Sequence, residues 1–170
     1  SYGSLVRRFI KGQRSVVFLG AGQLAQEIYP WVKKDVDAVS VFCRNPMARY
    51  QDGEWDSNAD LKSLSKDFVA ERSVTVIVAA PMSAVDIQSF LSRQNAKIEA
   101  VIDLRGESRK DPLSDEYQVI SLDEAFKEIQ KSQCFAKQMA EKAQKHILAL
   151  ARESLELIQV RPFGWEDAWG

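Results

Sequence analysis

The feature that most constrains the fold is a short glycine-containing segment, Gly20-Ala-Gly-Gln-Leu-Ala25, which follows a run of apolar residues. The run, 15–19, has the length and composition of a parallel strand that is covered on both faces. The residues after the glycines show helical periodicity over 23–34, with a kink expected at Pro30. A strand, a glycine turn and a helix in this order form the G-x-G-x-x-A fingerprint of a dinucleotide-binding βαβ unit.

Each position of the fingerprint has a physical task in holding a pyrophosphate. Gly20 permits the tight turn, Gly22 lets the backbone approach the anion, and Ala25 is small enough for the helix to pack closely on the strand. The free N–H groups at the helix N-terminus then face the negative charge. The residues expected to bind the dinucleotide here are Gly20, Ala21, Gly22, Gln23 and Leu24. The alternative is a glycine turn that serves packing alone.

The rest of the chain alternates between strands and helices. Further strands are expected at 38–42, 74–80, 98–104 and 117–121, with a weak one near 54–56. Helices are expected at 1–11, at 46–51, across 61–68, after Ser83, and from about 123 to 158. This alternation predicts an α/β fold, a doubly wound parallel sheet of the Rossmann type with strand order 3-2-1-4-5-6.

The sequence predicts two parts, a nucleotide-binding domain at 1–122 that includes the lead-in helix 1–11, and a long helix with a tail at 123–170. At about 1.5 Å per residue the helix would extend roughly 50 Å. Apolar residues recur along it with 3.5-residue spacing, at Phe126, Ile129, Ala136, Ala140, Ala143, Ile147, Leu150 and Leu157. This apolar series indicates that the helix packs against a partner, either another domain or a second copy of the chain in a homodimer. The alternative is a helix that folds back on its own sheet around Gln133.

Composition excludes several classes of function. Lys and Arg total 23 against 24 Asp and Glu, so the net charge of -1 gives no general attraction to nucleic acid or membranes. No apolar run approaches the roughly 20 residues of a membrane span. Two cysteines, Cys43 and Cys134, and the lack of a signal-peptide pattern indicate a cytoplasmic protein without a disulfide framework or zinc site. Because the chain has a single histidine, His146, we assign no metal site and no catalytic residue.

The end of the second strand bears on the choice of cofactor. An Asp or Glu there would bind the 2′-hydroxyl of an adenosine ribose, but this chain has Cys43, Arg44 and Asn45. The Arg44 guanidinium suits a 2′-phosphate, which favours NADPH over NADH, and the alternative is an ordinary surface charge. The expected cofactor-binding residues at the ends of later strands are Ala80, Pro81 and Asp103. The alternative for Asp103 is a structural acceptor for loop N–H groups.

Together these features resemble the NADPH-binding domain of the glutamyl-tRNA reductase family. The resemblance covers about 1–151 and rests on the glycine turn, the arginine-containing turn at 43–45, Ile102-Asp103-Leu104 with Asp111-Pro112 beyond it, and the acidic segment 119–125. It implies NADPH-dependent reduction of glutamyl-tRNA to glutamate-1-semialdehyde in tetrapyrrole (haem) biosynthesis. It also implies that the catalytic cysteine and the contacts with glutamyl-tRNA belong to domains outside this chain.

The sequence departs from the family at two points, both at the expected nicotinamide end. Between Leu104 and Asp111 the family's Ala-Val-Pro-Arg-Asp-Ile is replaced by Arg-Gly-Glu-Ser-Arg-Lys, and the Ser-Ser-Thr after the strand at 74–80 is replaced by Ala79-Ala80-Pro81. Two alternatives stay open. One is a module that senses NAD(P)H without turnover, and the other is the nucleotide domain of another small NADP-dependent dehydrogenase.

Overall fold

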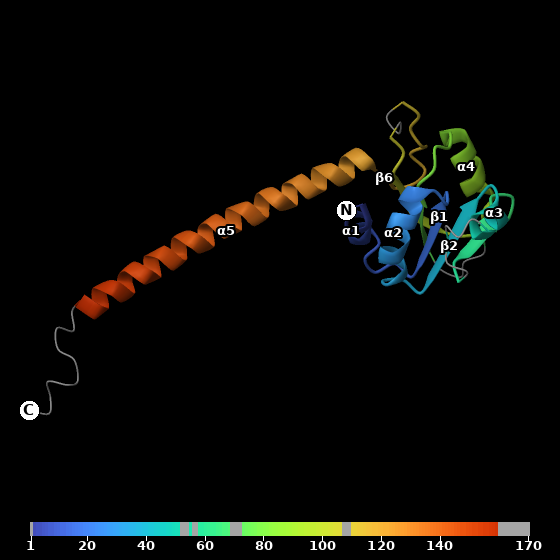
Figure 1. The fold of residues 1–170 in the computed structure, drawn as a ribbon. Helices are drawn as coiled ribbons and strands as arrows, with labels where there is room; N and C mark the ends of the chain where they lie inside the picture. Colours follow the sequence, from blue (N-terminus) through green and yellow to red (C-terminus); the bar gives the residue numbers. More distant parts are fainter. Residues whose placement is uncertain (1, 52–54, 56–57, 69–72, 107–109, 160–170) are drawn as a thin grey trace, which may run out of the picture. The chain divides into compact units, whose positions relative to one another are not determined.

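The protein forms two compact units, Ser1–Phe126 and Lys127–Gly170. The structure, a computed structural model, describes residues 2–51, 55, 58–68, 73–106 and 110–159. The first unit is built on a six-stranded sheet with helices on both of its faces (Figure 1). The second unit consists, in its described part, of the continuation of one helix.

Every neighbouring pair of strands in the sheet is parallel. The strands are β1 (Ser15–Leu19), β2 (Ala38–Cys43), β3 (Asp60–Ser63), β4 (Val74–Val78), β5 (Ile98–Asp103) and β6 (Val119–Ser121). The helices are α1 (Tyr2–Phe9), α2 (Gln23–Lys33), α3 (Pro46–Gln51), α4 (Ala84–Arg93) and α5 (Leu122–Gln159). The strand order β3-β2-β1-β4-β5-β6 confirms the doubly wound Rossmann-type fold expected from the sequence.

The central strands are buried on both faces, because successive side chains of a strand point to opposite sides of the sheet. Phe18 and Ile77 lie in the apolar layer that α1 and α2 cover, whereas Leu19 and Val78 lie in the layer under α4. This double burial accounts for the continuous apolar runs in the sequence of β1 and β4.

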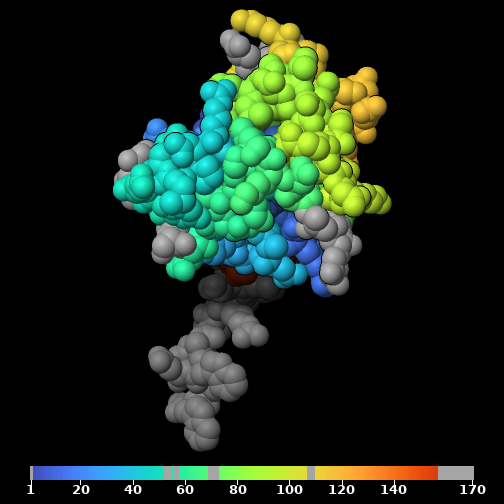
Figure 2. All heavy atoms as spheres, turned by 90° about the vertical axis from the view of Figure 1, so that its right-hand side faces the viewer, coloured from blue at the N-terminus to red at the C-terminus, as the bar shows by residue number. Residues whose placement is uncertain are grey.

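On the α4 side, the segment after β3 is fixed to the helix by polar contacts. Arg93 of α4 forms an ion pair with Asp67 at 2.8 Å and donates to the Leu64 carbonyl at 2.7 Å. Figure 2 shows this face, with the green segment around Leu64–Phe68 lying between α3 (cyan) and α4 (lime). The segment therefore packs with α4 on one face of the sheet.

The structure corrects the sequence prediction at the β3 edge of the sheet. The apolar spacing across 61–68 predicts a helix, but residues 60–63 form β3, paired in parallel with β2. Leu61 is buried in the α2 layer, whereas Phe68 packs in the opposite layer against Phe42, with ring centroids 5.9 Å apart. The prediction was wrong because the two side chains serve opposite faces of the sheet and do not form one helical face.

The other helices and strands begin and end within two residues of their predicted bounds. The weak strand expected near 54–56 falls on residues of which the structure describes only Trp55. The domain boundary expected at 122–123 stays a prediction.

Helix α5 is uninterrupted over its 38 residues, so it has no break near Gln133. Its start is capped reciprocally, since the Ser121 N–H donates to Glu124 Oε2 at 2.9 Å and the Glu124 N–H donates to Ser121 Oγ at 3.3 Å. Exposed apolar side chains follow along it at Phe135, Met139, Ile147, Leu148, Leu150 and Leu155. Within the described ranges, no helix combines the length and the apolar character that crossing a bilayer requires.

The close approach of β1 to β4 depends on Gly20. Its φ angle is +109°, and a Cβ placed on it would lie 2.5 Å from the Ala80 Cβ. The Gly20 N–H also donates to the Phe42 carbonyl at 2.8 Å. Gly20 therefore joins the end of β1 to its neighbours on both sides.

Replacing Gly20 by alanine should lower the free energy of unfolding by about 2–5 kcal/mol, because a left-handed backbone costs roughly 1–2 kcal/mol and a forced overlap roughly 1–3 kcal/mol. Gly12→Ala is the matched control, since Gly12 has a φ of +88° but no heavy atom within 4 Å of its Cβ position. The control should lose about 1–2 kcal/mol. Urea unfolding measures both variants, and equal losses would show that the contact with Ala80 sets no constraint.

Candidate functional site

Two cavities lie side by side at the carboxyl edge of the sheet and share the residues Ala79–Met82 that follow β4. One cavity, of 500 Å³, lies over the ends of β1 and β2 and is called the β2-side cavity here. The other, of 490 Å³, lies toward the end of β5 and is called the β5-side cavity. They meet where the strand order reverses between β1 and β4, which is where open α/β sheets bind ligands.

The structure brings most of the predicted cofactor-binding residues together around the β2-side cavity. Those that line it are Gly20, Ala21, Gly22, Cys43, Arg44, Asn45, Ala80 and Pro81. Leu24 lines the β5-side cavity, together with Ala80 and Pro81, and Gln23 is the first residue of α2. Their contact with a cofactor stays a prediction.

The N-terminus of α2 is open toward an external acceptor. Its N-cap is Gly22, which has an ordinary φ of -81° and supplies no side-chain cap, and the first turn of α2 contains no acidic residue. Nothing lies within 4 Å of the position that a Gly22 Cβ would occupy. The first N–H groups of a helix need partners from outside the helix, so this cradle fits a pyrophosphate.

Among the described residues that line the β2-side cavity, Arg44 and Arg49 carry guanidinium groups and none is acidic. Arg44 is exposed at the end of β2, and among the described residues it has no hydrogen-bond or ion-pair partner. Arg49 comes from α3, whose first turn is capped by Asn45 Oδ1 accepting the Ala48 N–H at 3.3 Å. Sequence reasoning did not assign Arg49 to the site. The pair suits a phosphate group.

Among the described residues that line the β2-side cavity, Cys43 at the end of β2 is the one with a nucleophilic side chain. Burial raises the pKa of its thiol, against the opposing effect of the Arg49 guanidinium. Because the thiolate is the nucleophilic form, this environment lowers the reactivity of the Cys43 thiol. Among the described residues, no three His, Cys, Asp or Glu side chains gather into a group that would hold a metal ion.

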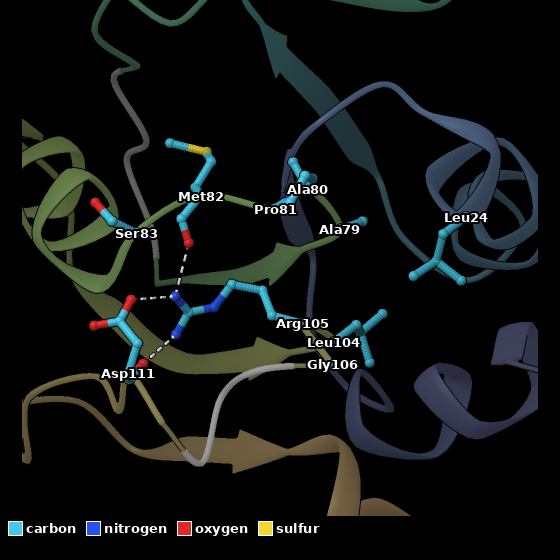
Figure 3. Close-up of a pocket in the computed structure, with 10 residues that line it drawn as sticks. All are labelled: Leu24, Ala79, Ala80, Pro81, Met82, Ser83, Leu104, Arg105, Gly106 and Asp111. Carbon is cyan, nitrogen blue, oxygen red and sulfur yellow. Dashed lines mark hydrogen bonds and ion pairs between the residues drawn. The ribbon is translucent and has the colours of Figure 1, made fainter.

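The β5-side cavity has an ion-pair network in its wall (Figure 3). The Arg105 guanidinium is 6% exposed and donates to both carboxylate oxygens of Asp103, at 3.0 Å from Nε and 2.8 Å from Nη2. Its Nη1 donates to the Met82 carbonyl at 2.8 Å and to Asp111 Oδ2 at 3.1 Å. The hydrogen bonds with Asp103 raise the pKa of Arg105. In Figure 3 Leu24 lies across the cavity from Met82 and Asp111.

The network joins β5 to the start of α4. Asp111 Oδ2 also accepts the N–H of Ala84, the first residue of α4, and Ser83 caps that helix by accepting the Asp86 N–H at 3.1 Å. The sequence predicts a polar loop over 105–116, and the described part of that segment contains neither helix nor strand, although the Arg105 side chain within it is buried. The sequence contains a sign of this ion pair, because Asp103 and Arg105 are two residues apart and such residues in an extended segment point to the same side.

Asp103 is 1% exposed and lines neither of these cavities. It accepts the Arg105 backbone N–H at 3.1 Å, which is the structural role that the sequence offers as the alternative. A direct contact of Asp103 with a cofactor stays a prediction, and the ion pair argues against it.

Trp55 is a further residue that sequence reasoning missed. Its indole Nε1–H donates to the Ala21 carbonyl of the glycine turn at 3.0 Å, and its ring packs edge-on against Tyr29 of α2 with centroids 5.0 Å apart. The side chain is 7% exposed. Because 34 residues separate Trp55 from Ala21, no local spacing could reveal this contact.

No family model matches the chain, and no curated protein matches its sequence. Among solved structures, glutamyl-tRNA reductase from Methanopyrus kandleri superposes with a TM-score of 0.51 at 17% identity, over 95% of this chain and 45% of that one. A chorismate mutase/shikimate 5-dehydrogenase fusion protein from Clostridium acetobutylicum gives a TM-score of 0.43 at 16% identity, over 71% and 47%. The first likeness agrees with the Rossmann-type fold. The chain spans less than half the length of that reductase.

Replacing Arg105 by methionine should lower the free energy of unfolding by about 3–5 kcal/mol, because Asp103 is left buried without its counter-charge. Asp111→Asn is the control, since it keeps an oxygen acceptor on a side chain that is 45% exposed, and it should cost less than about 1 kcal/mol. Urea unfolding at neutral pH measures both. If the two variants lost the same stability, the Asp103 pair would not hold this edge of the sheet.

Proposed function

We propose that this chain is the NADPH-binding domain of a dehydrogenase-type enzyme. The observation that carries the proposal is the open N-cap at Gly22, which lies beside a cavity lined by Arg44 and Arg49. An N-terminus without its own cap can receive an anion, and the guanidinium groups of Arg44, just after β2, and of Arg49, in α3, add a place for a second one. Pyrophosphate and 2′-phosphate are the two anionic groups of NADPH.

In this proposal, different residues of the two cavities bind different parts of the nucleotide. The turn at Gly20–Gly22 and the first N–H groups of α2 would hold the pyrophosphate, and Arg44 would hold the 2′-phosphate. Leu24, Ala80 and Pro81 would pack against the nicotinamide half and exclude water from it. When bound, a reduced nicotinamide supplies a hydride, and the protein's task is to orient it.

We propose further that the parent enzyme is a glutamyl-tRNA reductase, which reduces glutamyl-tRNA to glutamate-1-semialdehyde for tetrapyrrole biosynthesis in the cytoplasm. The sequence motifs at 43–45, 102–104 and 119–125 support this assignment, as does the likeness in fold to the reductase from Methanopyrus kandleri. In this proposal the reactive cysteine and the contacts with glutamyl-tRNA belong to parts outside this chain.

NADPH should bind the chain about 10- to 100-fold more tightly than NADH, because a charge-assisted contact with a phosphate contributes about 1.5–3 kcal/mol. Arg44→Ala should remove this preference and leave the affinity for NADH unchanged. Isothermal titration calorimetry with both nucleotides measures the ratio. Equal affinity of the unmodified chain for NADPH and NADH would exclude Arg44 from a 2′-phosphate site.

Gly22→Ala tests the role of the glycine turn in nucleotide binding. Its φ of -81° is ordinary and its Cβ would enter open space, so the variant should keep its melting temperature. The added methyl group occupies the place where the backbone approaches the pyrophosphate, so NADPH and NADH should both bind more weakly. Unchanged binding of both nucleotides would remove the turn from the site.

We also propose that a second copy of this chain covers the exposed apolar side chains of α5. Charges of both signs lie along the same helix, at Lys142, Glu153 and Glu156 among others, so two copies of the helix can pair without net repulsion. Light scattering coupled to size exclusion should show a dimer. Ile147→Glu, at a side chain that is 64% exposed, should give a monomer, whereas Lys145→Glu should not. A monomeric unmodified chain would overturn this assignment.

A further inference from the structure

The Ala21–Gly22 peptide is the part of the glycine turn whose orientation a side chain controls. Backbone hydrogen bonds hold the Leu19–Gly20 and Gly22–Gln23 peptides, since the Gly20 N–H donates to the Phe42 carbonyl at 2.8 Å and the Gln26 N–H donates to the Gly22 carbonyl at 3.1 Å. The Ala21 carbonyl instead accepts the Trp55 indole N–H at 3.0 Å. Trp55 thus holds the Ala21–Gly22 peptide between them.

The direction of this bond fixes where the neighbouring donor points. In a trans peptide the C=O and N–H groups lie in one plane and point in opposite directions. Because the Ala21 carbonyl faces the Trp55 indole, the Gly22 N–H points away from Trp55. Trp55 is buried in the apolar layer with Tyr29 and lines neither cavity, whereas Gly22 lines the β2-side cavity.

We propose that Trp55 is a positioning residue for the anion site, holding the Gly22 N–H in the orientation that receives a pyrophosphate. A residue is needed for this task because Gly22 has no Cβ and its peptide rotates more freely than that of any other residue type. The N-cap adds no side-chain contact that would orient it. This inference rests on the proposed function, since it assigns a role in binding the nucleotide that the function requires.

Trp55→Phe is the test, because phenylalanine keeps an aromatic ring against Tyr29 while it removes the N–H donor together with the second ring of the indole. Calorimetry should show binding of NADPH weakened by about three- to tenfold, the effect of one lost hydrogen bond. NADH should weaken by the same factor, since both nucleotides share the pyrophosphate. This pattern differs from that of Arg44→Ala, which changes the ratio between the nucleotides.

Leu91→Ala provides the matched control for a general loss of stability. Leu91 of α4 is 2% exposed in the opposite apolar layer and lines neither cavity. It should lower the melting temperature and leave both nucleotide affinities unchanged. If Trp55→Phe bound NADPH and NADH as the unmodified chain does, the inference would be overturned while the proposed function stood.

A second measurement needs no change at Trp55. In a ¹⁵N-labelled chain with Trp31, Trp165 and Trp169 replaced by phenylalanine, the remaining indole N–H resonance belongs to Trp55. Titration with NADPH should shift this resonance and slow its exchange with solvent, because the bound anion fixes the same peptide from its other side. An unshifted resonance at saturating NADPH overturns the inference. Failure of the unmodified chain to bind either nucleotide overturns the proposed function, and this inference with it.

Discussion

The contact between Gly20 and Ala80 is the constraint on which the rest of the structure depends. At this point β1 and β4 approach so closely that a Cβ on residue 20 would lie 2.5 Å from the Ala80 Cβ. The strand order reverses between the same two strands, so the chain leaves them toward opposite faces of the sheet and a crevice opens above the contact. Both cavities share Ala79–Met82 for this reason.

The fold was predictable wherever burial leaves a local pattern in the sequence. The five residues of β4 are all buried, and their apolar run marks the strand clearly. The edge strand β3 leaves no such pattern, because its stability comes from polar contacts with its neighbour. Ser40 Oγ–H of β2 donates to Asp60 Oδ2 at 2.6 Å, and Lys62 Nζ of β3 donates to Ser40 Oγ at 3.2 Å. These residues have low strand propensity, so pairing across the sheet decides their conformation.

The residues of the candidate site also differ in how readily the sequence reveals them. Those of the glycine turn belong to one short segment, and their spacing identifies them. Trp55 and Arg105 hold other residues in place, and sequence reasoning missed both. Trp55 contacts a carbonyl 34 residues away, and Arg105 stands in a segment whose composition is that of an exposed loop. Motifs thus reveal the groups that would touch a ligand more readily than the groups that orient them.

The charges along the crevice favour one orientation of the nucleotide in the proposed complex. On the β2 side, the open N-terminus of α2 lies beside Arg44 and Arg49, and the described lining residues include no acidic one. On the β5 side, the described lining has one guanidinium, that of Arg105, and one carboxylate, that of Asp111, which form an ion pair at 3.1 Å. The described lining of the first cavity therefore attracts a phosphate more strongly than that of the second. In the proposed complex this difference would put the adenosine phosphates over β2 and the uncharged nicotinamide toward β5.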